Sequence, residues 1–276
     1  MPQSALNLPL LKTLPWLAEH QHLALMLDYD GTLSPIVANP EQAFIDEAAL
    51  GQLVRLSAHP HISLAIISGR SIEQLEKFLA PLFKTNALFC GMHGGQIYDP
   101  KTQITLKAFM PSQYLPVLAD FKARLLAELT PQNLLHSGLT LEEKSCSIAL
   151  HTRNMQQAAQ KTQAIALFKA TARTITESAS ALFKLQPGKE VLELVPAIFS
   201  KAVAAEFLYE FWQQKSARPI LLCYIGDDLT DEPAFTWVNA HNGISIAVGK
   251  THPETTEARY HLENVAQVHQ LLGRLL

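Results

Sequence analysis

Five short apolar runs constrain the fold of this chain more than any other feature, because each ends at a turn of glycine or polar residues. The runs lie at 23–27, 62–67, 87–90, 220–225 and 244–248. An apolar run of this length, closed by a turn, is typical of a strand buried on both faces of a parallel sheet. Helical patterns follow several runs, for example at 46–58 and from Ser71. The sequence therefore predicts an α/β fold, with a Rossmann-like, doubly wound parallel sheet and right-handed crossovers.

The middle of the chain has a different pattern, in which helical spacing alternates with the period-two spacing of antiparallel strands. These segments are at 111–130, 144–153, 154–173, 183–186 and 191–195. We expect Asn154 to be the N-cap of the second helix. Residues 109–195 are thus predicted to form an inserted α+β domain, and residues 1–108 and 196–276 the core. A further amphipathic pattern at 8–20 favours a leading helix.

Composition excludes several classes of protein. Hydrophobic residues make up 48% of the 276 residues and charged residues 17%, which indicates a folded globular chain. The net charge of −3 gives no basic patch for nucleic acid, and no apolar stretch reaches the roughly 20 residues of a membrane helix. The first residues lack an export signal, and Cys90, Cys146 and Cys223 are too scattered to suggest disulfides. We therefore expect a cytoplasmic protein, and a monomer, that binds neither nucleic acid nor membrane.

Two carboxylates two positions apart follow the first apolar run, at Asp28 and Asp30, and lead into Gly31 and Thr32. Residues at i and i+2 of a strand point to the same face, so the two charges repel each other. A bound cation is the simplest compensation. The alternative is an acidic turn that caps a helix, and the pair alone does not decide between them.

Polar residues also follow other apolar runs directly, and the carboxyl ends of parallel strands are where ligands bind in such sheets. Ser68 follows the second run, and Asp227 and Asp228 follow the fourth. Carboxylates with backbone carbonyls and water suit Mg²⁺, and no cluster of Cys and His at zinc spacing exists. Each residue also has a simpler interpretation: Ser68 could cap the next helix, and Asp231 with Glu232 could simply favour a helix N-terminus.

Lys201 lies in the first turn of the predicted helix 200–213, where a cation opposes the helix dipole. It is either an exposed lysine that tolerates this position or a partner of the acidic edge. A hydroxyl, a lysine and a metal ion around one point would form a phosphoryl-binding site, in which an aspartate can attack phosphorus.

These residues carry a family resemblance. Asp28-Tyr-Asp-Gly-Thr-Leu33, Ser68-Gly-Arg70, Lys201 and Gly226–Glu232 occur in the order found in the haloacid dehalogenase-like superfamily, with an insertion before the lysine. Other segments resemble the trehalose-6-phosphate phosphatases, namely 91–94, 142–147, 151–153 and 188–193. Two positions depart from the family pattern: Ala202 follows the lysine where glycine is usual, and Thr152 stands where tyrosine is usual.

The resemblance implies roles for the core residues. Asp28 is the expected nucleophile, Asp30 the acid and then the base, and Ser68 and Lys201 hold the phosphoryl oxygens. Mg²⁺ is the expected cofactor. Its expected ligands are Asp28, the carbonyl of Asp30, and Asp227, while Asp228 and Asp231 orient its waters or the lysine.

The resemblance also implies a small-molecule sugar phosphate as substrate, with trehalose 6-phosphate expected and a functional link to its synthase. The expected substrate-binding residues are Gly69, Arg70, His93, Glu142, Lys144, Arg153 and Glu193. The inserted-domain residues could instead form a solvated face, and His93 could be a plain turn residue. Rival functions are phosphatases of sucrose phosphate or of a glycosyl-phosphoglycerate, and a non-catalytic sugar-phosphate sensor.

Overall fold

The structure is a computed structural model that describes residues 3–4, 22–108, 112, 114–144, 146–178, 182–188, 190–249 and 256–276. The chain divides into two compact units, one of Met1–Ala108 with Ser200–Leu276 and one of Phe109–Phe199. The leading helix expected at 8–20 lies outside the described residues. In the described parts of the chain, no helix has the length and apolar composition needed to cross a membrane.

The first unit contains a nine-stranded mixed sheet. Its spatial order is β1 (Gln3–Ser4), β13 (Tyr260–Leu262), β12 (Ile244–Val248), β11 (Ile220–Gly226), β2 (His22–Leu27), β3 (Ile62–Ile67), β4 (Leu88–Gly91), β5 (Gln96–Asp99) and β6 (Ile104–Ala108). All neighbours from β1 to β4 pair in parallel, and β5 and β6 extend the sheet with antiparallel pairs. The predicted parallel α/β sheet is confirmed, and the antiparallel extension is an addition to it.

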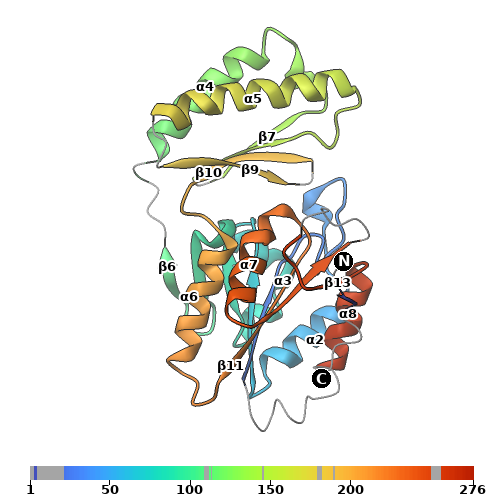
Figure 1. Ribbon diagram of the computed structural model, residues 1–276. Helices are drawn as coiled ribbons and strands as arrows, with labels where there is room; N and C mark the ends of the chain where they lie inside the picture. Colours follow the sequence, from blue (N-terminus) through green and yellow to red (C-terminus); the bar gives the residue numbers. More distant parts are fainter. Residues whose placement is uncertain are drawn as a thin grey trace. The chain divides into compact units, whose positions relative to one another are not determined.

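Helices cover both faces of this sheet (Figure 1). One face packs against α2 (Glu47–Ser57), α3 (Ile72–Leu79) and α8 (Val265–Arg274), and the other against α6 (Lys201–Gln213) and α7 (Glu232–Ala240). Short 3₁₀ turns connect the elements at η3 (Pro40–Gln42), η4 (Leu82–Lys84), η5 (Met92–Gly94) and η8 (Leu229–Asp231).

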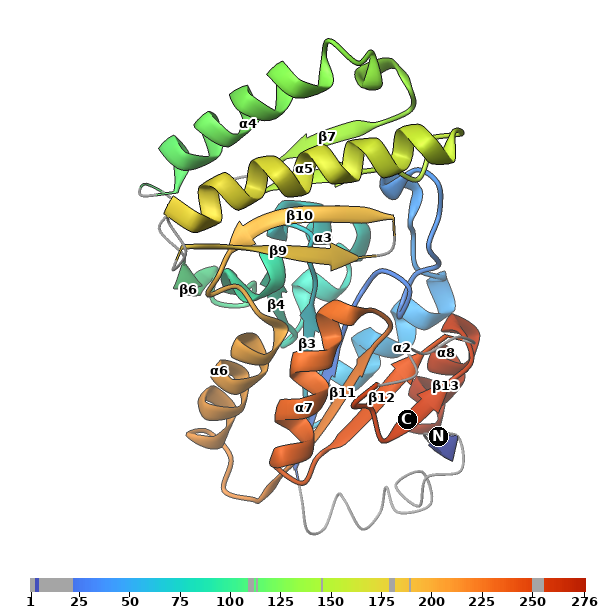
Figure 2. The same cartoon turned by 45° about the horizontal axis from the view of Figure 1, so that its top comes forward.

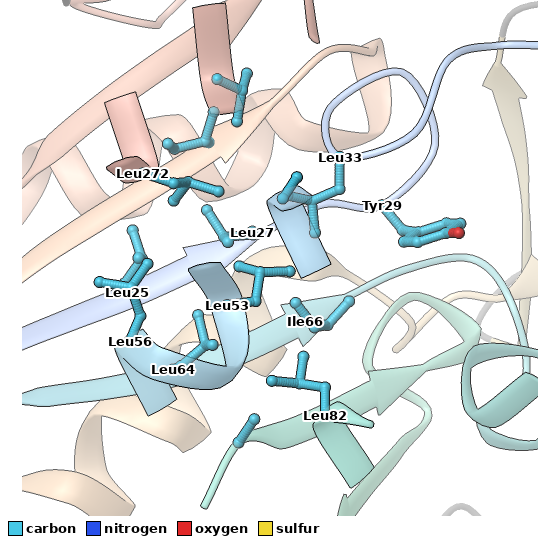
Figure 3. Packing of buried hydrophobic residues seen from close by; sticks show 14 of the residues in the cluster. Leu25, Leu27, Tyr29, Leu33, Leu53, Leu56, Leu64, Ile66, Leu82 and Leu272 are labelled. Atoms are coloured by element: carbon cyan, nitrogen blue, oxygen red, sulfur yellow. The ribbon is translucent and has the colours of Figure 1, made fainter. Parts of the chain in front are cut away.

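The central strand β2 shows why the sequence forms a sheet that is covered on both faces. Leu25 and Leu27 belong to the apolar cluster on the α2 side (Figure 3), whereas Ala24 and Met26 belong to the cluster on the α6 side. All four side chains are fully buried. Because successive residues of a strand point to opposite faces, an uninterrupted apolar run is needed to fill both layers.

The second unit is a four-stranded antiparallel sheet with two helices on one face (Figure 2). The strand order is β7 (Thr140–Glu143), β8 (Ile148–His151), β10 (Val191–Pro196) and β9 (Phe183–Gly188). The helices are α4 (Leu115–Leu129) and α5 (Ala158–Ser178), and a 3₁₀ turn, η7 (Leu134–His136), follows α4. Phe121 of α4 and Phe168 of α5 meet edge to face at 5.1 Å between centroids, above the apolar face of the sheet.

The prediction that Asn154 caps the second helix is wrong, because α5 begins at Ala158. The residues before it form a separate turn, in which the Met155 amide donates to the Thr152 carbonyl at 3.1 Å. Gly138 packs closely on this turn, since a Cβ built there lies 2.3 Å from the Asn154 carbonyl oxygen. The contact with Gly138 and the Thr152 turn occupy the backbone that the predicted helix start requires.

Candidate active site

Asp28 is held at the carboxyl end of β2 by both backbone and side-chain contacts. Its amide donates to the Ile225 carbonyl at 2.9 Å, which extends the pairing of β2 with β11 by one residue. Its Oδ1 accepts from Lys201 Nζ at 2.9 Å. Asp28 is 4% exposed and Lys201 is 3% exposed, so this ion pair is almost completely removed from water.

Lys201 is the first residue of α6, where the Ser200 hydroxyl caps the helix by accepting from the Ala202 amide at 3.2 Å. Its ammonium also donates to Asp231 Oδ1 at 2.7 Å. Burial lowers the pKa of Lys201, but the Asp231 and Asp28 carboxylates outweigh burial and raise it above its usual value. Two carboxylates thus more than offset the unfavourable helix dipole, which costs about 0.3–1 kcal/mol. The interpretation of Lys201 as an exposed lysine is wrong.

Asp231 holds the lysine and the backbone of the neighbouring acidic turn together. Its Oδ1 accepts from Lys201 and from the Tyr224 hydroxyl at 2.6 Å, and its Oδ2 accepts from the amides of Asp227 and Asp228, each at 3.0 Å. It precedes α7 but makes no side-chain capping bond to it. Asp231 and Glu232 do lie at a helix start, because Asp231 forms a reciprocal capping box with Asp228 at η8 and Glu232 is the first residue of α7. The Asp231 carboxylate has a second role there, since it also holds Lys201. Our sequence reasoning missed Tyr224, because a tyrosine inside an apolar strand resembles an ordinary core residue.

Three carboxylates at this edge lie close enough to hold a cation, since ligand atoms of Asp28, Asp227 and Asp231 are within 4.8 Å of one another. Asp231 already accepts four hydrogen bonds, which leaves Asp28 and Asp227 as the better ligands. Asp227 sits against the backbone of Gly31, where a Cβ would lie 2.0 Å from its Oδ2. The φ angle of 82° at Gly31 also favours glycine.

The electrostatics of the cluster fit a divalent cation. Burial raises the pKa of Asp28 well above its ordinary value, Asp231 and Asp227 raise it further, and Lys201 opposes them. One lysine therefore does not neutralise the group, and oxygen ligands of this kind are those that Mg²⁺ prefers. The carboxylate of Asp228 accepts from the Leu229 amide and caps η8. Metal ligation by Asp228 and by the Asp30 carbonyl stays a prediction.

Ser68 ends β3 next to the same edge and is 1% exposed. Its amide donates to the Cys90 carbonyl at 2.9 Å, and its hydroxyl accepts from the Arg70 amide at 3.2 Å. The cap of α3 is Ser71, which forms a reciprocal capping box with Gln74. The interpretation of Ser68 as that cap is wrong, and its role as a phosphoryl ligand stays a prediction.

His93 lies in a strained turn that supports the Ser68 segment. Met92 and His93 both have left-handed backbones, with φ of 51° and 53°, a conformation that costs of order 1–3 kcal/mol for residues other than glycine. The turn is fixed because the His93 amide donates to the Ser68 carbonyl at 2.8 Å and the Met92 amide to the Arg70 carbonyl at 2.9 Å. A Cβ at Gly69 would lie 2.6 Å from His93 Nε2, so glycine is needed there. His93 is therefore more than a plain turn residue, although substrate binding by Gly69 and His93 stays a prediction.

Asp30 and Arg70 form a bidentate ion pair. Arg70 Nε donates to Asp30 Oδ2 at 2.7 Å, and Arg70 Nη2 donates to Asp30 Oδ1 at 2.6 Å. Burial lowers the pKa of Arg70, but the hydrogen bonds and charge of Asp30 outweigh it and raise the pKa. The expected acid and base is thus bound to a residue that was expected to bind substrate.

In the second unit, polar side chains gather on the sheet face opposite to α4 and α5. Glu193 is 6% exposed and accepts from the Ser147 hydroxyl at 2.5 Å and from Lys144 Nζ at 3.1 Å. Glu142 Oε2 accepts a hydrogen bond from His151 Nε2 at 2.9 Å. The hydrogen bond to His151 lowers the pKa of Glu142; burial opposes this change and Lys144 adds to it.

Register explains this grouping, since Glu142 and Glu193 each pair with Ala149 and so lie in one row across the sheet. Four residues of the inserted domain were predicted to bind substrate, and the structure brings three of them together. The fourth, Arg153, follows β8. The hydrogen bond from Lys161 lowers the pKa of Glu190 in the turn between β9 and β10, and the charge of Arg153 adds a smaller effect. Sugar binding by these residues stays a prediction.

The fold of this chain is that of solved haloacid dehalogenase-like proteins. A haloacid dehalogenase-like hydrolase from Bacteroides thetaiotaomicron matches 93% of this chain and 100% of its own, with a TM-score of 0.64 at 16% identity. The C-terminal domain of the Candida albicans trehalose-6-phosphate phosphatase shares the fold more fully, with a TM-score of 0.80 at 24% identity over 100% of this chain and 98% of that domain.

The family model for trehalose-phosphatase matches residues 26–266, and the chain belongs to that family. A probable trehalose-phosphate phosphatase of Oryza sativa subsp. japonica is 32% identical over 257 residues, which cover 92% of this chain. The chain spans 66% of the length of that relative.

Proposed function

We propose that this protein is a phosphoric monoester hydrolase that converts trehalose 6-phosphate to trehalose and phosphate. The observation that carries the proposal is the buried cluster of Asp28, Lys201 and Asp231 at the carboxyl ends of β2 and β11. Two buried carboxylates share one lysine, so one negative charge is not neutralised. Burying that charge is costly unless a bound cation compensates it, as a site for a phosphoryl group would require. Membership of the trehalose-phosphatase family supports the same substrate.

In the proposed reaction a carboxylate oxygen of Asp28 attacks phosphorus, and the bond between phosphorus and the sugar oxygen breaks. Asp30 gives its proton to that oxygen, which leaves as a hydroxyl of trehalose. Asp30 then takes a proton from water, whose oxygen attacks the aspartyl-phosphate and releases phosphate and Asp28. Ser68 and Lys201 bind the phosphoryl oxygens. Asp28 and Asp227 would hold Mg²⁺, which would supply positive charge to the phosphoryl oxygens.

The proposed selectivity rests on the polar sheet face of the second unit, through Glu142, Lys144, Glu193 and Arg153. Carboxylates and a lysine offer directional acceptors and donors to sugar hydroxyls, and a site built in this way rejects analogues that leave its groups unpaired. Sucrose phosphate and glycosyl-phosphoglycerates remain the rival substrates. A non-catalytic sensor is expected to lose the nucleophile or a metal ligand, whereas Asp28, Asp30 and Asp227 are all present.

We further propose that the protein acts in the cytoplasm as a monomer and takes its substrate from a trehalose-6-phosphate synthase. The buried thiols of Cys90 and Cys223 support a reducing compartment. Burial raises the pKa of the Cys223 thiol to about 12, so this thiol stays protonated and unreactive.

Release of phosphate from a panel of sugar phosphates, with and without Mg²⁺, tests the proposed function. We expect kcat/KM for trehalose 6-phosphate to exceed that for glucose 6-phosphate and sucrose 6-phosphate by at least about tenfold, since one lost hydrogen bond to a charged group costs about 1.5–3 kcal/mol. EDTA should abolish the activity, and added Mg²⁺ should restore it. Equal rates for trehalose 6-phosphate and glucose 6-phosphate contradict the assigned substrate.

A further inference from the structure

The guanidinium of Arg70 contacts a carboxylate, a backbone carbonyl and two aromatic rings of the first unit. Besides its two bonds to Asp30, Nη2 donates to the Pro40 carbonyl at 2.9 Å. Its Cζ lies 4.6 Å from the centre of the Phe78 ring and 5.4 Å from that of the Tyr29 ring. The Arg70 side chain is 8% exposed, whereas that of Asp30 is 41% exposed. Arg70 is thus the fixed member of the pair, and Asp30 is the member that has room to move.

The wall behind Arg70 is itself fastened at several points. The Tyr29 hydroxyl donates to the Ala43 carbonyl at 2.6 Å, and the ring of Phe44 meets that of Phe78 edge to face at 5.0 Å. Lys77 of α3 also forms a salt bridge with Glu41. Movement of Arg70 toward a substrate would break its contacts with a carbonyl and two rings, so the fold opposes a direct role in substrate binding.

The two oxygens of Asp30 face the opposite constraint. A carboxyl group that protonates a leaving oxygen must present one of its own oxygens to that atom. In the structure both oxygens accept from Arg70. A bidentate pair with a guanidinium favours the ionised carboxylate, so Asp30 must take up a proton from solvent and loosen its contact with Arg70 before it acts as an acid. After it has taken the proton of the attacking water, it loses that proton to solvent and pairs with Arg70 again.

We propose that Arg70 is a positioning residue, which seats the Asp30 carboxylate between turnovers and fixes the path along which it reaches the leaving oxygen. The inference rests on the proposed phosphatase function. It replaces direct substrate binding as the role of Arg70. The proposal predicts that Arg70 matters most when the leaving group needs a proton.

Leaving groups that differ in their need for a proton provide the test. The alkoxide of a sugar leaves only with a proton, whereas p-nitrophenolate leaves without one. For Arg70→Gln, we expect the ratio of kcat on trehalose 6-phosphate to kcat on p-nitrophenyl phosphate to fall by about tenfold to a hundredfold, within the range that general acid catalysis contributes. Lys77→Gln is the matched control, because it breaks a contact from α3 to the same loop without touching Asp30, and its ratio should stay at the wild-type value.

Arg70→Lys is a second variant in case Arg70→Gln does not fold. Lysine keeps the positive charge but not the two parallel donors, so the kcat ratio should fall by a smaller factor than in Arg70→Gln. In an Asp30→Asn background, Arg70→Gln should lower the ratio no further. A role in binding phosphate is indicated, and the proposal overturned, if Arg70→Gln raises KM for both substrates alike and leaves the kcat ratio unchanged. Equal loss of both activities with a lower Tm indicates a structural role and also overturns it.

A wild-type protein that hydrolyses p-nitrophenyl phosphate but not trehalose 6-phosphate contradicts the proposed function alone. The Arg70 variants are then compared on the best alkyl phosphate of the panel, and the same fall in ratio is expected. Failure of the function and failure of this inference are therefore distinguishable.

Discussion

The two polar clusters of this protein are built in different ways. In the first unit, Asp28, Lys201 and Asp231 come from three distant segments and are between 0% and 4% exposed. In the second unit, Glu142 and Glu193 lie on β7 and β10, on either side of β8, and Lys144 follows β7; the Glu142 side chain is 34% exposed. The first cluster depends on the whole fold of its unit, whereas the second depends only on strand register.

This difference indicates how each cluster responds to change. A buried ion pair that loses one partner leaves a charge without compensation, which is strongly destabilising. A partly exposed group such as Glu142 can still be solvated, so its loss alters binding more than folding, whereas Glu193 on the same sheet face is 6% exposed. The buried cluster should therefore tolerate only isosteric substitution, and the sheet face should accept several.

The largest expected effect is loss of the nucleophile. Asp28→Asn keeps an acceptor for Lys201 Nζ but cannot form an acyl phosphate, so kcat should fall by at least about 10³-fold while the protein stays folded. Phosphate release and the far-UV circular dichroism melt measure the two quantities. Asp46→Asn is the control, since asparagine also caps the start of α2 and leaves kcat unchanged. Substantial activity in Asp28→Asn rules out the covalent mechanism.

The next effect separates the two clusters by stability. Lys201→Met leaves Asp28 and Asp231 buried without their cation and should lower the free energy of unfolding by about 3–5 kcal/mol. Lys122→Met removes an exposed partner of Glu143 in the second unit and should cost less than about 1 kcal/mol. Urea unfolding measures both. Similar losses of unfolding free energy in the two variants would contradict the expectation that the buried ion pair contributes more to stability than the exposed one.

A smaller effect is expected on selectivity. Glu193→Gln keeps the shape of a buried acceptor but loses its charge, so kcat/KM for trehalose 6-phosphate should fall about tenfold more than that for p-nitrophenyl phosphate. Glu143→Gln is matched in chemistry and lies on the same sheet, yet its side chain is 58% exposed and should have no such effect. If both substrates lose activity equally, Glu193 does not select the sugar.

The smallest effect concerns pH. The hydrogen bond with His151 holds the pKa of Glu142 below its ordinary 4.5 in the folded protein. Its contribution to stability is therefore present above pH 4.5 and is lost as the pH falls through the lowered value. Glu142→Gln should destabilise the protein by less than about 1 kcal/mol at pH 6, and this difference should shrink as the pH falls below 4.5. Thermal melts across this range provide the measurement, and a difference that grows on acidification contradicts the assignment.

The sequence predicted the strands that are buried on both faces, because uninterrupted apolar runs have few other uses. It did not predict β5, β6 or β13, which lie toward the edges of the sheet and carry exposed or polar residues such as Thr105 and His261. The start of α5 was misplaced because Asn154 has the chemistry of a cap but is held in a turn by tertiary contacts.

The candidate site shows the same division. The positions of Asp28, Ser68 and Asp227 follow from strand ends, and these could be read from the chain. The bond from Tyr224 to Asp231 and the fork of Arg70 on Asp30 could not, because each joins side chains whose meeting depends on packing.

Gly94 packs closely against the start of α6, near the point where the chain returns from the inserted unit. A Cβ at Gly94 would lie 2.9 Å from both the Ala204 Cβ and the Ser200 carbonyl oxygen, so the start of α6 is pressed against η5. The chain returns to the first unit at Ser200, one residue before the lysine of the active site. Lys107, at the point of departure, lies 5.8 Å from the Phe207 ring of the same helix. The segments of the first unit that flank the insertion are thus both tied to α6. The inserted unit can therefore change in sequence without displacing Lys201, which lies at the start of that helix.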